Sequence, residues 1–227
     1  MSKLMYTPFY LTFTTECEKI LLLGGICVKK EMSCELKAGL LLGGMATFTL
    51  IFLFMMFIPN PANFIFWIGF NETAWEIPLA WVLALAVSVA YIAYTAFGIP
   101  TVRQNLFKFN LLKVVGIFAA FTSGLIEEIV FRRMLMDWLY TVNVDVVLQV
   151  LLSGMAFGIT HFVWALFAKN WRVGVGAVIP TTVLGLLLAI VYLVAGRNVL
   201  PTIMAHTLIN LFIEPWLILH AVKEKKW

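Results

Sequence analysis

Four charged side chains stand together in a stretch of the sequence that is otherwise almost entirely apolar. They lie within residues 111–140 and are Glu127, Glu128, Arg132 and Arg133. A charged side chain at membrane depth costs roughly 2.5–3.5 kcal/mol on insertion scales, so such residues usually indicate function. On a helix, Glu128 precedes Arg132 by four residues, the favourable order for an ion pair, whereas Glu127 has an apolar residue at that spacing. The pattern predicts a structural Glu128–Arg132 pair beside a free carboxylate, Glu127.

Two later apolar stretches each contribute a histidine. Phe157 and His161 are four residues apart, and so are His206 and Asn210, so each pair shares one face of a helix. A single histidine in a membrane span is more often a packing group than a ligand. A helix bundle, however, can bring Glu127, His161, His206 and Asn210 from three separate stretches to one interior cavity. We therefore treat these four residues as candidates for one site.

The residue types in this set fit hydrolysis. A carboxylate and an imidazole can act together as a general base toward water. A second imidazole and a carboxamide can donate hydrogen bonds to a carbonyl oxygen on which negative charge develops. Glu127, His161 and His206 would also suit a divalent metal such as Zn²⁺, so the sequence leaves open both a metal-dependent reaction and one without a cofactor. No serine lies in a Gly-x-Ser-x-Gly nucleophile motif.

Composition indicates the elements that must hold these residues. The chain of 227 residues is 62% hydrophobic and 12% charged, which is far from the composition of a soluble domain. Continuous apolar runs of about 20 residues predict transmembrane helices, because they are long enough to cross a bilayer. We expect an all-α, polytopic transmembrane helical bundle of about six spans. The expected spans are residues 39–58, 79–97, 111–136, 146–168, 174–195 and 201–221.

The N-terminal part differs because its two apolar stretches are too short to cross a bilayer. We expect residues 1–38 to form an interfacial segment and residues 39–227 to form one transmembrane bundle. Loops rich in lysine and arginine alternate with poor ones, which predicts that both termini are cytoplasmic. Three arginines do not fit this alternation, because they lie on the side of the membrane where the loops are otherwise poor in basic residues. They are Arg132, Arg133 and Arg197.

The net charge of +4 suits anionic lipid headgroups. A basic face with interleaved aromatic residues is missing outside the apolar spans, so we expect no nucleic-acid partner. The three cysteines form no C-x-x-C pair, and we expect reduced thiols rather than a disulfide framework.

Three motifs in order resemble those of the CAAX-processing and bacteriocin-processing (CPBP, or Abi) intramembrane proteases. They are E-E-x-x-x-R at residues 127–132, F-x-x-x-H at residues 157–161 and H-x-x-x-N at residues 206–210. The resemblance covers residues 111–221, which would form the catalytic core, and the first 110 residues carry none of it.

The resemblance implies a role for each motif residue. Glu127 would be the catalytic carboxylate and would activate water together with His161. His206 and Asn210 would stabilise the tetrahedral oxyanion. The residues implied to support the site structurally are Glu128, Arg132 and Phe157. Members of this family have been described both as metalloproteases and as glutamate-dependent proteases, so metal ligation by Glu127, His161 and His206 stays open.

The resemblance also implies the partners and the location. We expect the lipid bilayer and a peptide or membrane-protein substrate as partners. The substrate would be a prenylated C-terminus, a leader or pheromone peptide, or another membrane protein, of which the prenylated C-terminus does not suit a bacterial source. The small size of the chain is typical of a prokaryotic member, so we expect an integral protein of a prokaryotic plasma membrane.

Two alternatives belong to other functional classes. A non-catalytic membrane scaffold or immunity-type protein could keep the motifs for stability alone. A haem-binding bundle could use His161 and His206 as axial ligands, because ligation by two histidines from two helices is physically reasonable. The haem alternative leaves Glu127, Glu128 and Asn210 without a role.

Overall fold

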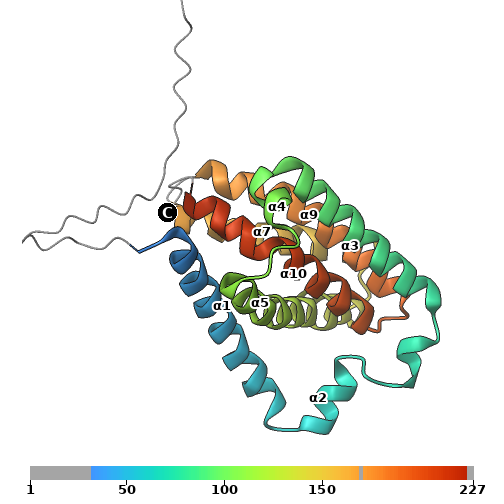
Figure 1. Cartoon of the computed structure of the whole chain (residues 1–227). Coiled ribbons are helices and arrows are strands. Elements are labelled where there is room, and N and C mark those ends of the chain that lie inside the picture. The colour runs from blue at the N-terminus through green and yellow to red at the C-terminus, as the bar shows by residue number, and fades with distance from the viewer. Residues whose placement is uncertain (1–31, 169–170, 224–227) are drawn as a thin grey trace, which may run out of the picture.

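The computed structural model describes residues 32–168 and 171–223, which fold into helices and connecting turns (Figure 1). This part of the chain contains no strand, so the predicted all-α fold class is confirmed. The elements in chain order are α1 (Cys34–Phe57), α2 (Pro61–Trp67), the 3₁₀ helix η1 (Glu72–Trp75), α3 (Pro78–Gly98), α4 (Pro100–Asn105), α5 (Leu111–Glu128), the π-helix η2 (Ile129–Met136), α6 (Asp137–Thr141), α7 (Val146–Thr160), α8 (Val163–Ala168), α9 (Trp171–Val194) and α10 (Leu200–Lys223).

Six helical stretches within the described residues are long and apolar enough to cross a bilayer. Their mean hydropathy lies between 1.4 and 2.4. Many large apolar side chains are exposed on the outside of the bundle, where lipid would cover them. The protein is therefore an integral membrane protein, as its composition predicted. The spans are Cys34–Phe57, Pro78–Gly98, Leu111–Thr141, Val146–Ala165, Trp171–Val194 and Leu200–Lys223.

Some predicted boundaries were wrong. The first span begins at Cys34, earlier than predicted, because the Ser33 side chain caps the helix by accepting a hydrogen bond from the Leu36 N–H at 3.2 Å. The third span continues to Thr141 instead of ending at residue 136. The predicted interfacial segment lies outside the described residues over positions 1–31.

The fourth predicted span, residues 146–168, is interrupted before its end. α7 ends at Thr160, and the separate helix α8 begins at Val163. Between them, the backbone N–H of His161 donates to the Gly158 carbonyl at 3.0 Å. This bond reaches back three residues rather than four, which tightens the last turn and ends the helix. His161 therefore lies at a helix end rather than in the middle of a straight span.

The helix that carries the first motif changes its winding. The π-helix η2 follows α5 without a break. π-helical turns are rare and frequently occur at functional sites. Side chains from other elements donate to carbonyls of this segment: Ser153 to the Phe131 carbonyl at 2.9 Å, and Arg197 to the Met136 carbonyl at 3.4 Å. These contacts stabilise the irregular winding.

Close helix packing depends on glycine at two interfaces. α5 packs along α10, and α7 packs along α9. A Cβ atom at Gly116 of α5 would lie 2.2 Å from Cγ of Pro215 in α10. A Cβ atom at Gly158 of α7 would lie 1.8 Å from Oγ1 of Thr182 in α9. Small residues thus let these backbones approach closely, which is how transmembrane helices commonly associate.

Pro215 interrupts the hydrogen bonding inside α10. It has no N–H for the carbonyl four residues earlier, which belongs to Leu211. Lys113 of α5 supplies a donor, since its Nζ donates to the Leu211 carbonyl. The same ammonium group lies 5.1 Å and 5.8 Å from the ring centroids of Phe212 and Trp216. A buried lysine in an apolar span is therefore accounted for by the proline on the neighbouring helix.

A polar cluster joins the helices at the end of the bundle where α6 leads into α7. Asp137 pairs with Arg133 at 3.0 Å and with Arg197 at 2.9 Å. Tyr192 donates its hydroxyl to Asp137 at 2.7 Å, and Arg197 donates to the Gln149 side chain at 2.5 Å. Both arginines are thus held in ion pairs rather than free in a loop, which explains why they disagree with the loop-charge pattern.

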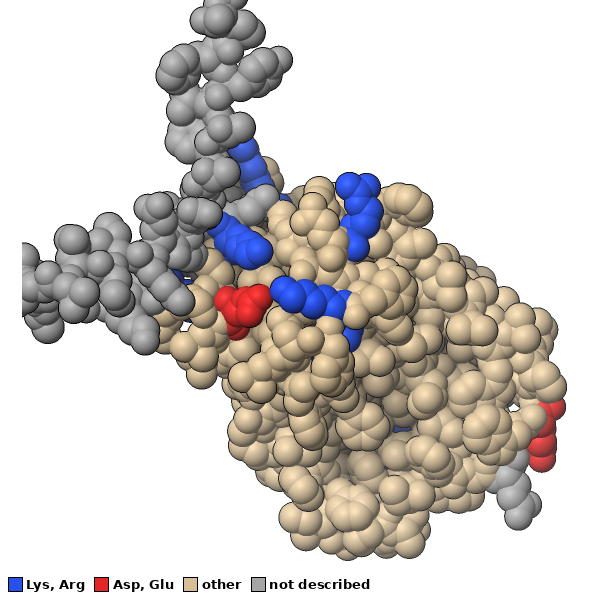
Figure 2. All heavy atoms as spheres, in the orientation of Figure 1, with Lys and Arg blue, Asp and Glu red and all other residues tan. Residues whose placement is uncertain are grey.

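Other basic side chains gather at the opposite end of the bundle. Figure 2 shows lysine and arginine clustered where the described chain begins. This asymmetry is the pattern from which a cytoplasmic location of both termini was predicted. The orientation in the membrane stays a prediction. Basic residues at or near the helix ends on this side are Lys37, Arg103, Lys108, Arg172 and Lys223.

Candidate active site

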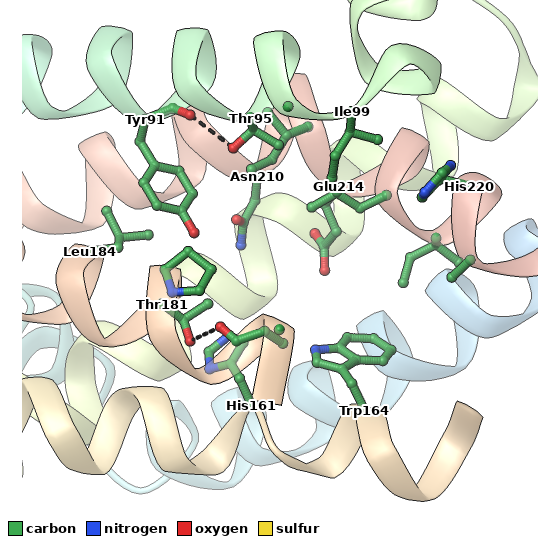
Figure 3. Close-up of a pocket in the computed structure, with 18 of the residues that line it drawn as sticks. Tyr91, Thr95, Ile99, His161, Trp164, Thr181, Leu184, Asn210, Glu214 and His220 are labelled. Carbon is green, nitrogen blue, oxygen red and sulfur yellow. Dashed lines mark hydrogen bonds between the residues drawn. The ribbon is translucent and has the colours of Figure 1, made fainter. Parts of the chain in front are cut away.

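A cavity of about 760 Å³ lies among α3, α5, α7, α9 and α10 (Figure 3). Most of its lining is apolar or aromatic. The structure brings the side chains of all four candidate residues to this one cavity, although they come from three separate spans. Their catalytic roles stay predictions. The four residues are Glu127, His161, His206 and Asn210.

Glu127, near the end of α5, faces His161 at the end of α7. Oε2 of Glu127 lies 3.9 Å from Nε2 of His161 and has no hydrogen-bond partner among the described residues. Nδ1 of His161 lies 2.8 Å from the Phe157 carbonyl oxygen, which can only accept, so Nδ1 carries a proton. In the neutral ring Nε2 is then an acceptor. Two acceptors then lie close enough together for one small donor beside them to reach both.

The predicted pair of Glu128 and Arg132 is present and fully buried. Arg132 Nε lies 3.1 Å from Glu128 Oε2, and both side chains have an exposed fraction of 0%. The guanidinium also donates to the Gly185 carbonyl of α9 at 3.0 Å and lies 5.0 Å from the centre of the Phe157 ring. The pair thus ties the first motif to α7 and α9.

Glu128 has a second partner that the sequence did not indicate. Its Oε1 lies 2.9 Å from Nδ1 of His206 on α10. Because the carboxylate accepts, Nδ1 of His206 donates, and Nε2 is the ring nitrogen left for a ligand in the cavity. Such a bond to the far nitrogen fixes both the tautomer and the orientation of an imidazole. Glu128 therefore orients His206 as well as balancing the charge of Arg132.

A hydrogen bond to a residue of α5 fixes the side chain of Asn210. Its Nδ2 donates to Oγ of Ser123 at 3.1 Å. Ser123 precedes Glu127 by one helical turn, so both side chains lie on the face of α5 that meets α10. Ser123 was not predicted as a site residue, although its spacing from Glu127 was a usable signal.

Phe157 is the packing centre of the site. Its buried ring has its centroid 4.8 Å from that of His161 and 5.4 Å from that of His206. The Phe131 ring packs edge-on against it at 5.3 Å. Phe157 thus contacts both imidazoles and restricts their movement. Axial ligation of haem needs a flat macrocycle between two imidazoles, and a phenyl ring packs against both of them here, so this arrangement does not support the haem alternative.

A carboxyl group that lines the cavity was not predicted from the sequence. Glu214 lies one turn after Asn210 and two turns after His206 on α10, and it lines the same cavity. Glu214 continues the four-residue interval between His206 and Asn210. A charged residue in an apolar span is also itself an indication of a functional site, so Glu214 could have been predicted. Aromatic residues from α3 and α8 complete this part of the lining. They include Tyr91, Tyr94 and Trp164.

The metal expectation finds no support in the grouping of the side chains. Over the ranges that the structure describes, no three histidine, cysteine, aspartate or glutamate side chains are arranged to hold a metal ion. Metal ligation by Glu127, His161 and His206 stays a prediction, and the mechanism below assigns no step to a metal.

Comparison with known proteins adds one finding. A family model described as type II CAAX prenyl endopeptidase Rce1-like matches residues 109–212. No curated protein and no solved structure matches the chain. The matched range contains all three motifs and the four candidate residues of the cavity, and it agrees with the resemblance drawn from those motifs. Residues 109–212 of this chain are therefore similar to the Rce1-like type II CAAX prenyl endopeptidases.

Proposed function

We propose that this protein is an intramembrane endopeptidase in which Glu127 and His161 activate a water molecule for attack on a peptide bond. The observation that carries the proposal is the pair of facing acceptors, Glu127 Oε2 and His161 Nε2, separated by 3.9 Å in the cavity. A water molecule between them can donate one hydrogen to each, which leaves an oxygen lone pair directed at a substrate.

The other wall of the cavity supplies donors for the oxyanion. When the His206 ring carries both protons, Nδ1–H is bound to Glu128 and Nε2–H is available to the carbonyl oxygen of the substrate. Asn210 can offer the amide hydrogen that Ser123 does not take. Donors fixed in advance in a site that excludes bulk water stabilise a developing oxyanion strongly.

The reaction follows from these positions. The water oxygen forms a bond to the carbonyl carbon while one of its protons passes to the base formed by Glu127 and His161. The oxyanion accepts hydrogen bonds from His206 and Asn210. The carbon–nitrogen bond then breaks, and the proton held by the base moves to the leaving nitrogen. The products are a carboxyl group and an amine.

The substrate is proposed from the setting of the site and from the family. A cavity with a mostly apolar lining inside a bundle of spans suits a polypeptide that is already at the membrane, either anchored by its own span or attached to a lipid. The family description names a prenyl endopeptidase, so a peptide with a prenylated cysteine near its C-terminus is the first substrate to test. Leader or pheromone peptides and membrane proteins are the other proposed classes.

The test compares two isosteric variants. Purified Glu127→Gln in lipid nanodiscs is incubated with a fluorogenic peptide that carries a prenylated cysteine three residues before its C-terminus, or with a membrane-anchored polypeptide. We expect cleavage to fall by about 10²–10⁴-fold, because loss of a general base has effects of this size. Glu35→Gln is the control, since Glu35 is half exposed and pairs only loosely with Lys108 at 3.7 Å.

The unfolding midpoints of both variants should stay near that of the unchanged protein, because Glu127 Oε2 has no hydrogen-bond partner to lose among the described residues. Full cleavage by Glu127→Gln would reject the proposed mechanism. If the unchanged protein cleaves neither substrate while it binds them, the non-catalytic scaffold becomes the better explanation.

A further inference from the structure

Glu214 is the carboxyl group in the cavity that the proposed mechanism does not use. It lies on the same face of α10 as His206 and Asn210 and lines the same cavity. Figure 3 shows its carboxyl group pointing into the open space, with the Trp164 indole on the opposite wall. Glu214 is therefore placed to touch whatever occupies the cavity.

The carboxyl group of Glu214 lacks a partner within the parts of the chain that the structure describes. Its Oε2 atom is buried and makes no hydrogen bond, and no lysine, arginine or histidine nitrogen of those residues pairs with it. Glu128, by contrast, is matched by Arg132 and His206. Leaving a carboxyl group unmatched at this depth costs several kcal/mol. A structural role explains Glu128, and it does not explain Glu214.

The surroundings favour one kind of ligand. The cavity already holds the Glu127 carboxylate, and Glu214 adds a second carboxyl group to a lining that also includes Arg172 of α9. The nearby aromatic side chains, among them Trp164 and Tyr91, offer ring faces that attract cations. A carboxylate combined with aromatic faces is suited to an ammonium or guanidinium group and unsuited to an acidic one.

The distance from the reaction centre follows from the helix. Glu214 is four residues beyond Asn210, which corresponds to about 6 Å along α10. It lies toward the end of the helix, where His220 also lines the cavity. An extended peptide advances about 3.3 Å per residue, so a side chain that meets Glu214 belongs to a residue about two positions from the bond that is cut.

We propose that Glu214 is a specificity residue that binds a lysine or arginine side chain of the substrate about two residues from the scissile bond. This inference rests on the proposed peptidase function and names a substrate class for it. The charged side chain would be matched by Glu214 and covered by the aromatic wall, while an acidic residue at the same position would be rejected.

The experiment uses three sets of membrane-anchored fluorogenic peptides. The first set carries lysine, the second norleucine and the third glutamate. Within each set, this residue is placed in turn at each of the three positions before and the three positions after the scissile bond. At one position we expect the unchanged protein to prefer lysine over norleucine by about tenfold or more in kcat/KM, mainly through KM, and glutamate to be the poorest. In Glu214→Gln this preference should fall to about one, whereas Glu35→Gln should keep it.

A binding measurement separates this inference from the proposed function. The same peptides, labelled with a fluorophore, are titrated with Glu127→Gln alone and with the double variant Glu127→Gln, Glu214→Gln, and anisotropy is read. A lysine preference in the first protein that disappears in the second supports Glu214 even if no peptide is ever cut. Equal affinity for lysine, norleucine and glutamate peptides in Glu127→Gln, or an unchanged lysine preference after Glu214→Gln, would overturn the inference while leaving catalysis untouched.

Discussion

Methionine in place of Arg132 tests how the first motif is held inside the bundle. Arg132 and Glu128 both have an exposed fraction of 0%, and their closest atoms are 3.1 Å apart. Without the guanidinium, Glu128 loses its cationic partner and keeps the imidazole of His206 at 2.9 Å. Methionine fills much of the arginine volume, so the change removes the charge and the hydrogen bond to the Gly185 carbonyl more than it removes packing.

The expected loss of stability is large. Removing one partner of a buried ion pair costs roughly 3–5 kcal/mol, because the other charge is left uncompensated. In Arg132→Met the hydrogen bond to the Gly185 carbonyl and the contact with the Phe157 ring are also lost, which favours the upper part of this range. At about 2–4 °C per kcal/mol for a chain of this size, the unfolding midpoint should fall by roughly 6–20 °C.

A double variant makes the reasoning refutable. In Glu128→Gln, Arg132→Met neither side chain is charged, so the stability should recover by at least about 1 kcal/mol relative to Arg132→Met. Tryptophan fluorescence during heating in detergent micelles gives the midpoints, and Arg103→Met, at an exposed position, is the control. An unchanged midpoint in Arg132→Met, or a double variant as unstable as the sum of its parts, would contradict the role given to this pair.

Two further changes test the packing of α5 on α10. Gly116→Ala should destabilise the protein by roughly 1–3 kcal/mol, because the new Cβ would overlap the Pro215 ring, whereas Gly44→Ala meets open space and should be neutral or slightly stabilising in the same thermal assay. Lys113→Met should cost roughly 1–3 kcal/mol, because the Leu211 carbonyl loses the donor that replaces the proline N–H. A midpoint equal to that of the unchanged protein would show that another group satisfies this carbonyl.

The number of spans and their approximate positions could be predicted from the sequence, because the length of an apolar run is set by bilayer thickness. The motif residues were equally accessible, since spacing on a helix determines which side chains share a face. Both signals are local. They singled out Glu127, His161, His206 and Asn210, and the assumption that a bundle brings its polar residues to one cavity made these four a group.

Features that depend on contacts between helices were not predictable in this way. The π-winding of η2 is stabilised by donors such as Ser153 and Arg197, and the hydropathy of the segment does not reveal them. The end of α7 at Thr160 falls inside a run that stays apolar, so the run was predicted as one straight span. In each case the hydropathy of the sequence fits a straight α-helix equally well, and hydrogen bonds from other elements or a local turn determine the structure that forms.

The same distinction applies within the site. The bond between Glu128 and His206 joins residues 78 positions apart, and no spacing rule relates them. Ser123 and Glu214 are different, because each lies one helical turn from a motif residue and was within reach of the same periodicity argument. They fall outside the family motifs, and their positions became informative only once the cavity was known.

The two neighbouring glutamates of α5 have a consequence for how this chain tolerates change. Side chains at adjacent helix positions point about 100° apart, so Glu127 and Glu128 have different surroundings although they are neighbours in the sequence. The Glu128 side chain is charge-balanced in the interior, and Glu127 lines the cavity. A single-residue deletion upstream in α5 would rotate the pair and turn the neutralised acid toward the cavity. The number of residues in α5 before Glu127 must therefore stay the same, because it sets the direction of both side chains, even where individual apolar residues of the helix can be exchanged.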